Sequence, residues 1–372
     1  MQIHCGEFYN IILNDRNELS VCGDNCFGQL GVGDNIIRSS YEILKHKFGK
    51  ITQIRGNWQS IILNSRNEIF TCGDNSCGQM GFGDNIDRNT HEMLKHNFGK
   101  IIQICCGGNY NIILNDKHDL FVCGNNSFGQ LGLKDYIDRN IYTKITDNYN
   151  FGNIVQICSG FSHNIILNSR NELFLCGNNE FGQLGFGDIV TRNFYVKLNH
   201  KFGKIVQIHC GFFHNIILND KNELFVCGRN CEGQLGFGDN FDRNKFKKLK
   251  HNFGTILQIR TNSYFNIILN NNNELFVCGR NTYGQLGLGH NNEQNSYIKL
   301  EHTMNKIKEI KCGMIHNLIL TEKDGQNELF TCGINIQEPN EKNIHTNNYI
   351  HDRIDTDFIK KKSSLMLSCF CL

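Results

Sequence analysis

A single pattern recurs along almost the whole chain and constrains the fold more than any other feature. Its clearest copy is the apolar run Glu223–Cys227, followed by Gly228 and then by the tetrad Gly-Gln-Leu-Gly at 233–236. The same Cys-Gly pair ends a similar run seven times, 50 to 54 residues apart, at Cys22, Cys72, Cys123, Cys176, Cys227, Cys278 and Cys332. A fixed period of this length predicts one repeat array over residues 1–333, not two or three independent domains.

Each unit contains four short segments with the composition of β-strands. In the fifth unit these are residues 204–208, 215–218 and 223–227, with a weaker fourth at 246–249. Asn and Asp in the segment 219–222 tolerate positive φ and predict a hairpin turn. No segment has a sustained helical period. Four strands in each of seven units predict an all-β fold, a seven-bladed β-propeller of four-stranded antiparallel blades.

The motif resembles that of the regulator of chromosome condensation repeat family of seven-bladed propellers. The matching residues are Cys-Gly-x-Asn-x-x-Gly-Gln-Leu-Gly, then Gly-Asp, then a Gly-x-x-His strand, and they cover roughly residues 2–333. His163, His214 and His316 occupy the last position. Two departures imply a differently packed core. Cys stands in all seven units where the family usually has Trp, and the Pro that usually follows Gly-Asp is missing from every unit.

The end of the chain departs from the repeat. The seventh unit has no Gly-Gln-Leu-Gly tetrad, and residues 334–372 read as a polar tail. Within this tail, Asn347–Ile350 resembles Asn295–Ile298 of the sixth unit. We therefore expect a segment near 347–350 to supply the outer strand of the last blade. The repeat phase leaves open which strands meet where the ring closes.

Charge and composition narrow the functional classes. The formal net charge of +2 gives no overall field that would draw the protein to DNA or to a membrane surface, so we expect no nucleic-acid partner. The sequence starts without an apolar signal segment and has no run that could span a bilayer. With 18 Cys and no signal segment, we expect reduced thiols and a cytoplasmic or nuclear location. We also expect a monomer.

The cysteines are interpreted as packing groups. The seven in the Cys-Gly pairs are expected to be small buried side chains at strand ends, and so is a second series, Cys5, Cys106, Cys210 and Cys312. A zinc site would need a second pair at the right spacing beside Cys22 and Cys26, or beside Cys227 and Cys231. No such pair occurs in the sequence, so we predict no metal.

We also predict no catalytic residue and no cofactor. The positions equivalent to the three aligned His are Tyr9, Gln59, Tyr110 and Phe265. A position that accepts Phe is expected to be structural, because Phe cannot transfer a proton. The segment around Lys50 lacks the flanking residues of a phosphate-binding loop.

Two features could serve partners. An arginine recurs in the loop before the fourth strand, at Arg38, Arg88, Arg139, Arg192 and Arg243, and would form a partial basic rim. The alternative is solvated charge paired with nearby Asp residues. Cys369, four residues from the end with a terminal Leu and with Lys360–Lys362 upstream, matches the prenylation pattern, which would give the only route to a membrane. The alternative is an apolar chain end.

The sequence favours a non-enzymatic protein-interaction propeller, because a rigid ring exposes mainly its loops. The family resemblance implies protein partners such as a small GTPase, chromatin or proteins of ubiquitin and trafficking pathways. One alternative is guanine-nucleotide exchange on a small GTPase, although the even spacing leaves no room for a large wedge insertion. Another is chromatin binding, for which the basic terminal segments of the family's chromatin binder are missing. Light sensing by relatives depends on clustered Trp. This chain has only Trp58, so we expect no light sensing.

Overall fold

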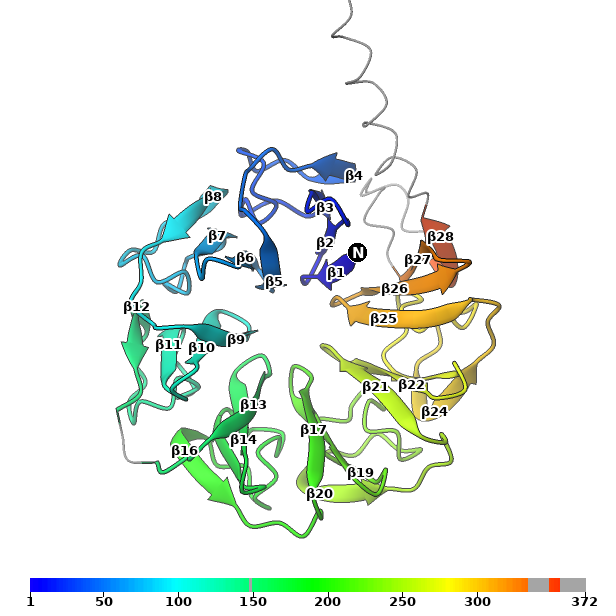
Figure 1. Ribbon diagram of the computed structural model, residues 1–372. Helices are drawn as coiled ribbons and strands as arrows, with labels where there is room; N and C mark the ends of the chain where they lie inside the picture. Colours follow the sequence, from blue (N-terminus) through cyan, green and yellow to red (C-terminus); the bar gives the residue numbers. More distant parts are fainter. Residues whose placement is uncertain (147–148, 334–347, 355–372) are drawn as a thin grey trace, which may run out of the picture.

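The computed structural model of the protein is a ring of seven β-sheets around a central axis (Figure 1). The structure describes residues 1–146, 149–333 and 348–354. Each sheet contains four consecutive antiparallel strands, so every blade is one continuous stretch of chain. The prediction of a seven-bladed propeller is therefore confirmed. No helix, and hence no helix that could cross a membrane, occurs in the described part of the chain.

The strands take the same four positions in each blade, and the first strands surround the axis (Figure 1). The first strands are β1 (Gln2–Cys5), β5 (Ile51–Gly56), β9 (Ile101–Cys106), β13 (Ile154–Ser159), β17 (Ile205–Cys210), β21 (Ile256–Thr261) and β25 (Lys306–Cys312). The second strands are β2 (Tyr9–Leu13), β6 (Gln59–Asn64), β10 (Tyr110–Asn115), β14 (His163–Asn168), β18 (His214–Asn219), β22 (Phe265–Asn270) and β26 (His316–Lys323).

The third and fourth strands complete each blade on the outside of the ring. The third strands are β3 (Leu19–Gly23), β7 (Ile69–Gly73), β11 (Leu120–Gly124), β15 (Leu173–Gly177), β19 (Leu224–Gly228), β23 (Leu275–Gly279) and β27 (Gln326–Gly333). The fourth strands are β4 (Arg38–Ile43), β8 (Arg88–Leu94), β12 (Arg139–Lys144), β16 (Arg192–Leu198), β20 (Arg243–Leu249), β24 (Gln294–Leu300) and β28 (Asn348–Ile354).

The hairpin between the second and third strands forms for a local reason. In the fifth blade, Asn219 Oδ1 accepts hydrogen bonds from the backbone N–H groups of Lys221, at 3.0 Å, and Glu223, at 2.8 Å. Asn222 has a φ of 61°, a left-handed conformation that Asn tolerates. Strands β18 and β19 then pair from Leu218 opposite Leu224 up to His214 opposite Gly228.

The hydrophobic core lies between neighbouring blades. The second strands are buried along almost their whole length, because each sheet packs against a sheet on either side. Between the fifth and sixth blades, Ile216 and Val226 of one sheet pack with Ile259 and Ile268 of the next, and all four are completely buried. Burying one such side chain contributes about 1.5–3 kcal/mol, so each interface holds two blades together strongly.

Side chains, not a shared sheet, close the ring between the first and last blades. Ile3 and Ile12 of the first blade pack against Leu318, Leu320 and Ile354 of the last. The last blade is completed by β28, which pairs with β27. The domain boundary at residue 333 stays a prediction, because most of residues 334–372 lie outside the described residues.

Candidate interaction surface

Histidine side chains join neighbouring blades at the start of the second strands. His214 Nε2 lies 2.8 Å from Asn266 Oδ1 in the next blade, and His316 Nε2 lies 2.8 Å from Asn10 Oδ1 across the closure. His163 makes the same contact with Asn215, at 2.8 Å. Burial lowers the pKa of His214 to about 4, so the ring is neutral near pH 7. These imidazoles act as joints between blades.

The cysteines that end the third strands form part of the same joints. The Cys227 thiol donates to the carbonyl of Gln183 in the preceding blade at 3.3 Å, and the Cys123 thiol donates to that of Gln79 at 2.9 Å. Burial raises the pKa of the Cys72 thiol to about 12, so it stays protonated and able to donate. These groups are therefore more than the small apolar fillers expected from the sequence.

The described residues contain no group of three or more side chains suited to hold a metal ion. Cys227 is completely buried, whereas Cys231 is exposed and accepts a hydrogen bond from Arg229 Nε at 3.0 Å. The two thiols thus lie in different surroundings despite their close sequence positions.

The five arginines of the expected rim are each held by a carboxylate of the same loop. They are the first residues of their fourth strands, not loop residues as the sequence indicated. The partners are Asp34 for Arg38, Asp84 for Arg88, Asp135 for Arg139, Asp188 for Arg192 and Asp239 for Arg243, at N–O distances of 2.5 to 2.8 Å. Their positive charges are therefore locally matched, and a binding role for this rim stays a prediction.

These ion pairs hold an exposed apolar side chain at the tip of the loop. In the second blade, Asp84 Oδ1 accepts from the backbone N–H of Ile86 at 3.1 Å, and Arg88 donates to its carbonyl at 2.5 Å. The Ile86 side chain is 67% exposed. The same arrangement repeats in the other four blades, with tips at Ile36, Ile137, Val190 and Phe241.

One face of the ring carries the loops between the first and second strands and those between the third and fourth. We call it the loop face. Its sequence varies from blade to blade. Over the fourth to sixth blades, aromatic and arginine side chains gather into what we call the aromatic–arginine surface: Phe161, Phe181, Phe212, Phe213, Arg229, Tyr264, Arg280 and Tyr283.

The two arginines lie over aromatic rings of this surface. The Arg229 guanidinium carbon lies 4.6 Å from the centroid of Phe181 and 5.3 Å from that of Tyr264. Arg280 lies 5.9 Å from Tyr264 and 5.4 Å from Tyr283. All of these side chains are half-buried. Stacking holds the guanidinium groups in place while their edges remain available for hydrogen bonds.

Arg229 and Arg280 replace residues that satisfy a buried amide in other blades. In the first two blades, Asp24 and Asp74 accept a hydrogen bond from the Gln of the Gly-Gln-Leu-Gly tetrad, at 2.9 and 2.8 Å. In the next two, Asn125 and Asn178 accept it, at 2.6 and 2.8 Å.

Where arginine follows the third strand, the buried side-chain nitrogens of Gln234 and Gln285 have no hydrogen-bond partner. An unsatisfied buried amide costs about 1–3 kcal/mol. A position that breaks a local rule of the fold in this way is a candidate for function. The sequence did not lead us to predict a role for this position, although the change from Asp or Asn to Arg after the Cys-Gly pair was visible.

Two carboxyl groups border this surface. Glu232 and Glu293 lie beside each other near Arg280, and desolvation followed by the hydrogen bond with Glu232 raises the pKa of Glu293 to about 7. Near neutral pH Glu293 is therefore protonated for part of the time, which limits the negative charge at this border.

The comparisons with known proteins agree with the repeat pattern. Residues 88–348 match the family model of the RCC1-like domain. The chain is 30% identical over 235 residues to the ultraviolet-B receptor UVR8 of Arabidopsis thaliana, which covers 62% of this chain and 52% of that protein. It is 35% identical over 156 residues to the secretion-regulating guanine nucleotide exchange factor of Bos taurus, covering 40% of this chain and 33% of that protein.

The chain thus spans about half or less of the length of these two curated relatives. Among solved structures, it is similar to Prp20p of Saccharomyces cerevisiae, described with its binding properties to Gsp1p and histones. The TM-score is 0.76 with 18% identity, over 91% of this chain and 85% of that chain. At this identity the likeness extends to the fold alone.

Proposed function

The chain belongs to the RCC1-like domain family, and we propose that it is a non-enzymatic propeller that binds a protein partner through its aromatic–arginine surface. The observation that carries the proposal is the replacement of Asp or Asn by Arg229 and Arg280, which leaves Gln234 and Gln285 unsatisfied. Arg, Tyr and Trp dominate the residues that contribute most to binding at protein interfaces. Guanidinium groups held over aromatic rings suit a partner with carboxylates next to an apolar patch.

Quantitative affinity capture tests the proposal. The test variant is Arg229→Asn with Arg280→Asn, which removes both charges and provides the residue found in the third and fourth blades. The control is Arg66→Asn with Arg170→Asn, two exposed arginines in the turns on the opposite face. We expect partners bound by the wild type to be lost from the test variant and retained by the control. Equal recovery with both variants would contradict the proposal.

A guanine-nucleotide exchange role on a small GTPase is the second candidate, favoured by the likeness to the secretion-regulating exchange factor. In most blades the second and third strands, which form a hairpin, have five or six residues each. The longest such hairpin among the described residues is β26–β27, with eight residues in each strand. Release of labelled GDP from a panel of purified GTPases tests this role, and acceleration of any member would support it.

Chromatin binding is a third candidate, because the similar Prp20p is described with histones. Nucleosome capture at low salt tests it, since electrostatic contacts with chromatin are strongest there. We further propose a cytoplasmic or nuclear location and a monomeric state. Membrane association would require prenylation of Cys369, which lies outside the described residues. Failure of Cys369 to incorporate a prenyl analogue in cells would remove that route.

A further inference from the structure

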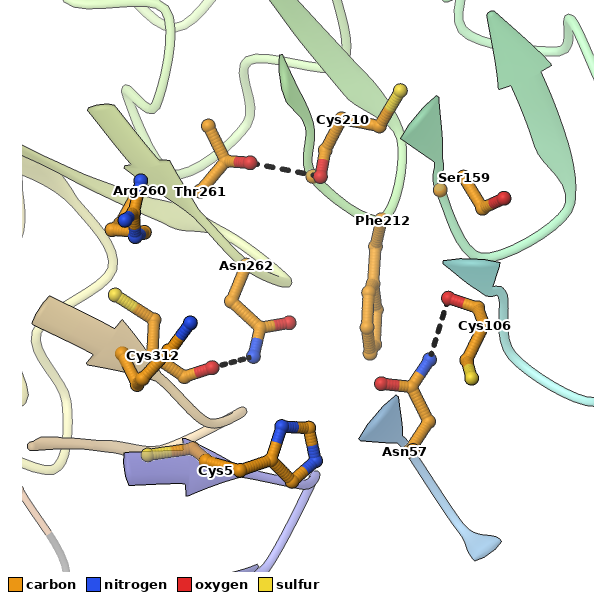
Figure 2. A pocket seen from close by; sticks show the side chains of 15 residues that line it. Cys5, Asn57, Cys106, Ser159, Cys210, Phe212, Arg260, Thr261, Asn262 and Cys312 are labelled. Atoms are coloured by element: carbon orange, nitrogen blue, oxygen red, sulfur yellow. Dashed lines mark hydrogen bonds between the residues drawn. The ribbon is translucent and has the colours of Figure 1, made fainter. Parts of the chain in front are cut away.

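A pocket of about 220 Å³ lies on the propeller axis and is lined by the ends of first strands from several blades. Figure 2 shows Arg260 and Asn262 on one side of it and Asn57 on the other, with Phe212 between Asn262 and Cys106. His4, Ser159 and Lys311 also line it. Four cysteines of the second series also line the pocket. Cys5 and Cys210 belong to the hydrophobic clusters between blades, and Cys106 and Cys312 pack against such clusters, as the sequence predicted.

Seven equivalent positions on the first strands lie around the axis, and three of them, His4, Arg260 and Lys311, line this pocket. Each follows the buried Ile near the middle of its strand, and the seven residues are His4, Arg55, Cys105, Cys158, His209, Arg260 and Lys311. Three are permanent cations near pH 7 and two are imidazoles. None of the seven is acidic.

The surroundings leave this charge largely uncompensated. Glu309 pairs with Lys311 at 2.9 Å. The hydrogen bonds of Arg260 go to uncharged groups, the carbonyls of Ile310 and Ile259, both at 2.8 Å, and the side chain of Gln258, at 3.3 Å. Among the described residues that line the pocket, none carries a carboxylate.

The titrating groups around the pocket do not supply the missing negative charge. Burial raises the pKa of Cys106 and of Cys312 to about 12, so these thiols stay neutral. Burial, followed by the charges of Lys311 and Arg55, lowers the pKa of His4 to about 3. The imidazole is therefore neutral near pH 7 and lies close to cations whose charge Glu309 offsets only in part.

An unused hydrogen-bonding group belongs to the same pocket. His4 is 8% exposed and lines the pocket, yet its Nε2 atom has no hydrogen-bond partner. A buried polar atom without a partner calls for an explanation, and a bound group that meets it together with Arg260 and Lys311 provides one.

We propose that the axial pocket binds a small oxyanion, with inorganic phosphate as the representative ligand, held by Arg260, Lys311 and His4. An oxyanion offers several acceptor oxygens to converging N–H and O–H donors. By volume the pocket holds roughly seven water molecules, since each occupies about 30 Å³ in the liquid. It is smaller than the roughly 300–1,000 Å³ of sites for drug-sized ligands, which favours a free ion over a larger phosphorylated molecule.

Calorimetric titration of the full chain with inorganic phosphate, against potassium chloride at equal ionic strength, tests the proposal. The test variant is Arg260→Gln, and the control is Arg66→Gln, an exposed arginine in a turn on the opposite face. We expect phosphate to bind the wild type and the control equally, and Arg260→Gln to weaken binding at least about tenfold, because a charge-assisted hydrogen bond is lost. Unchanged affinity of Arg260→Gln, or no heat beyond that of chloride, would overturn it.

A second readout uses the wild-type protein and remains valid if Arg260→Gln does not fold. The His4 imidazole resonance, assigned by comparison with His4→Gln, is expected to shift on phosphate addition and not on chloride addition. An unchanged His4 resonance at saturating phosphate would overturn the assignment of His4. Tighter binding of glucose 6-phosphate than of inorganic phosphate would overturn the assignment to a free ion.

Discussion

The interfaces between neighbouring blades, which we call seams, differ from the loop face in how far the seven copies agree. At five of the seven seams, an Asn of one blade accepts a hydrogen bond from a His, Gln or Tyr of its neighbour. Asn215 also donates to the neighbour's backbone, at the carbonyl of Gln183, at 2.6 Å. On the loop face, the equivalent residues change from Asp24 in the first blade to Arg229 in the fifth. Positions where the copies agree hold the ring together, and positions where they differ are available for binding.

Breaking a seam is expected to have the largest effect. Asn215→Ala removes the partner of the buried His163 Nε2 and one of the two donors to the Gln183 carbonyl, which keeps the Cys227 thiol. We expect the free energy of unfolding to fall by about 3–4 kcal/mol, since an orphaned buried group costs about 1–3 kcal/mol and a lost hydrogen bond about 0.5–1.5 kcal/mol. Urea denaturation measures this change.

Asn317→Ala is the matched control for this seam. The Oδ1 atom of Asn317 has no partner, because the preceding blade has Phe265 where other blades have a donor. Asn317→Ala should therefore destabilise less than Asn215→Ala by about 1–3 kcal/mol. Equal losses would contradict the role given to the His–Asn joints.

A departure from the repeat near the axis is expected to have the next largest effect. Glu7 is 1% exposed, its carboxyl oxygens have no partner, and burial raises its pKa from 4.5 to about 8. The folded state therefore holds a proton that the unfolded chain releases, so stability falls as the pH rises from 4.5 to 8.

Glu7→Gln should remove this penalty. We expect no gain in the free energy of unfolding at pH 4, and a gain of about 3 kcal/mol at pH 7. Thermal unfolding across this pH range measures the difference. A gain that is the same at every pH would show that Glu7 does not titrate as described.

A smaller effect, an increase in stability, is expected from a substitution on the loop face. Arg229→Asn gives Gln234 the acceptor that Asn178 provides for Gln183 at 2.8 Å. We expect the variant to be more stable by about 1 kcal/mol in urea, although it removes a charged surface group. Destabilisation would mean that Arg229 is retained for the fold and not for a partner.

The smallest effect is expected at the arginine rim. Arg243→Ala breaks the pair with Asp239, whose carboxylate is about one third exposed. Partly exposed ion pairs contribute at most about 1 kcal/mol, so we expect a loss of that size or less. If the rim also binds the partner, capture should weaken in this variant while folding is retained.

The sequence predicted the blades because every copy carries the same strand-and-turn chemistry. The positive φ of Asn222, for example, was visible as an Asn at the same place in five of the seven hairpin turns, with His118 and Asp324 in the other two. The closure could not be predicted, since contacts such as Ile3 with Leu318 join residues more than three hundred positions apart and leave no repeat signal. The axial pocket was missed for a related reason. Its residues converge from different blades, and each strand alone shows only one of them.

Hydrogen–deuterium exchange of the protein, alone and bound to a partner isolated by affinity capture, tests the central claim most directly. The account predicts slower exchange in the loop-face segments of the fourth to sixth blades, residues 178–183, 211–213, 229–234, 262–264 and 280–285. It predicts unchanged exchange in the turns of the opposite face, such as residues 65–67 and 169–171. Protection confined to those turns, or to the loops of the first two blades, would contradict it.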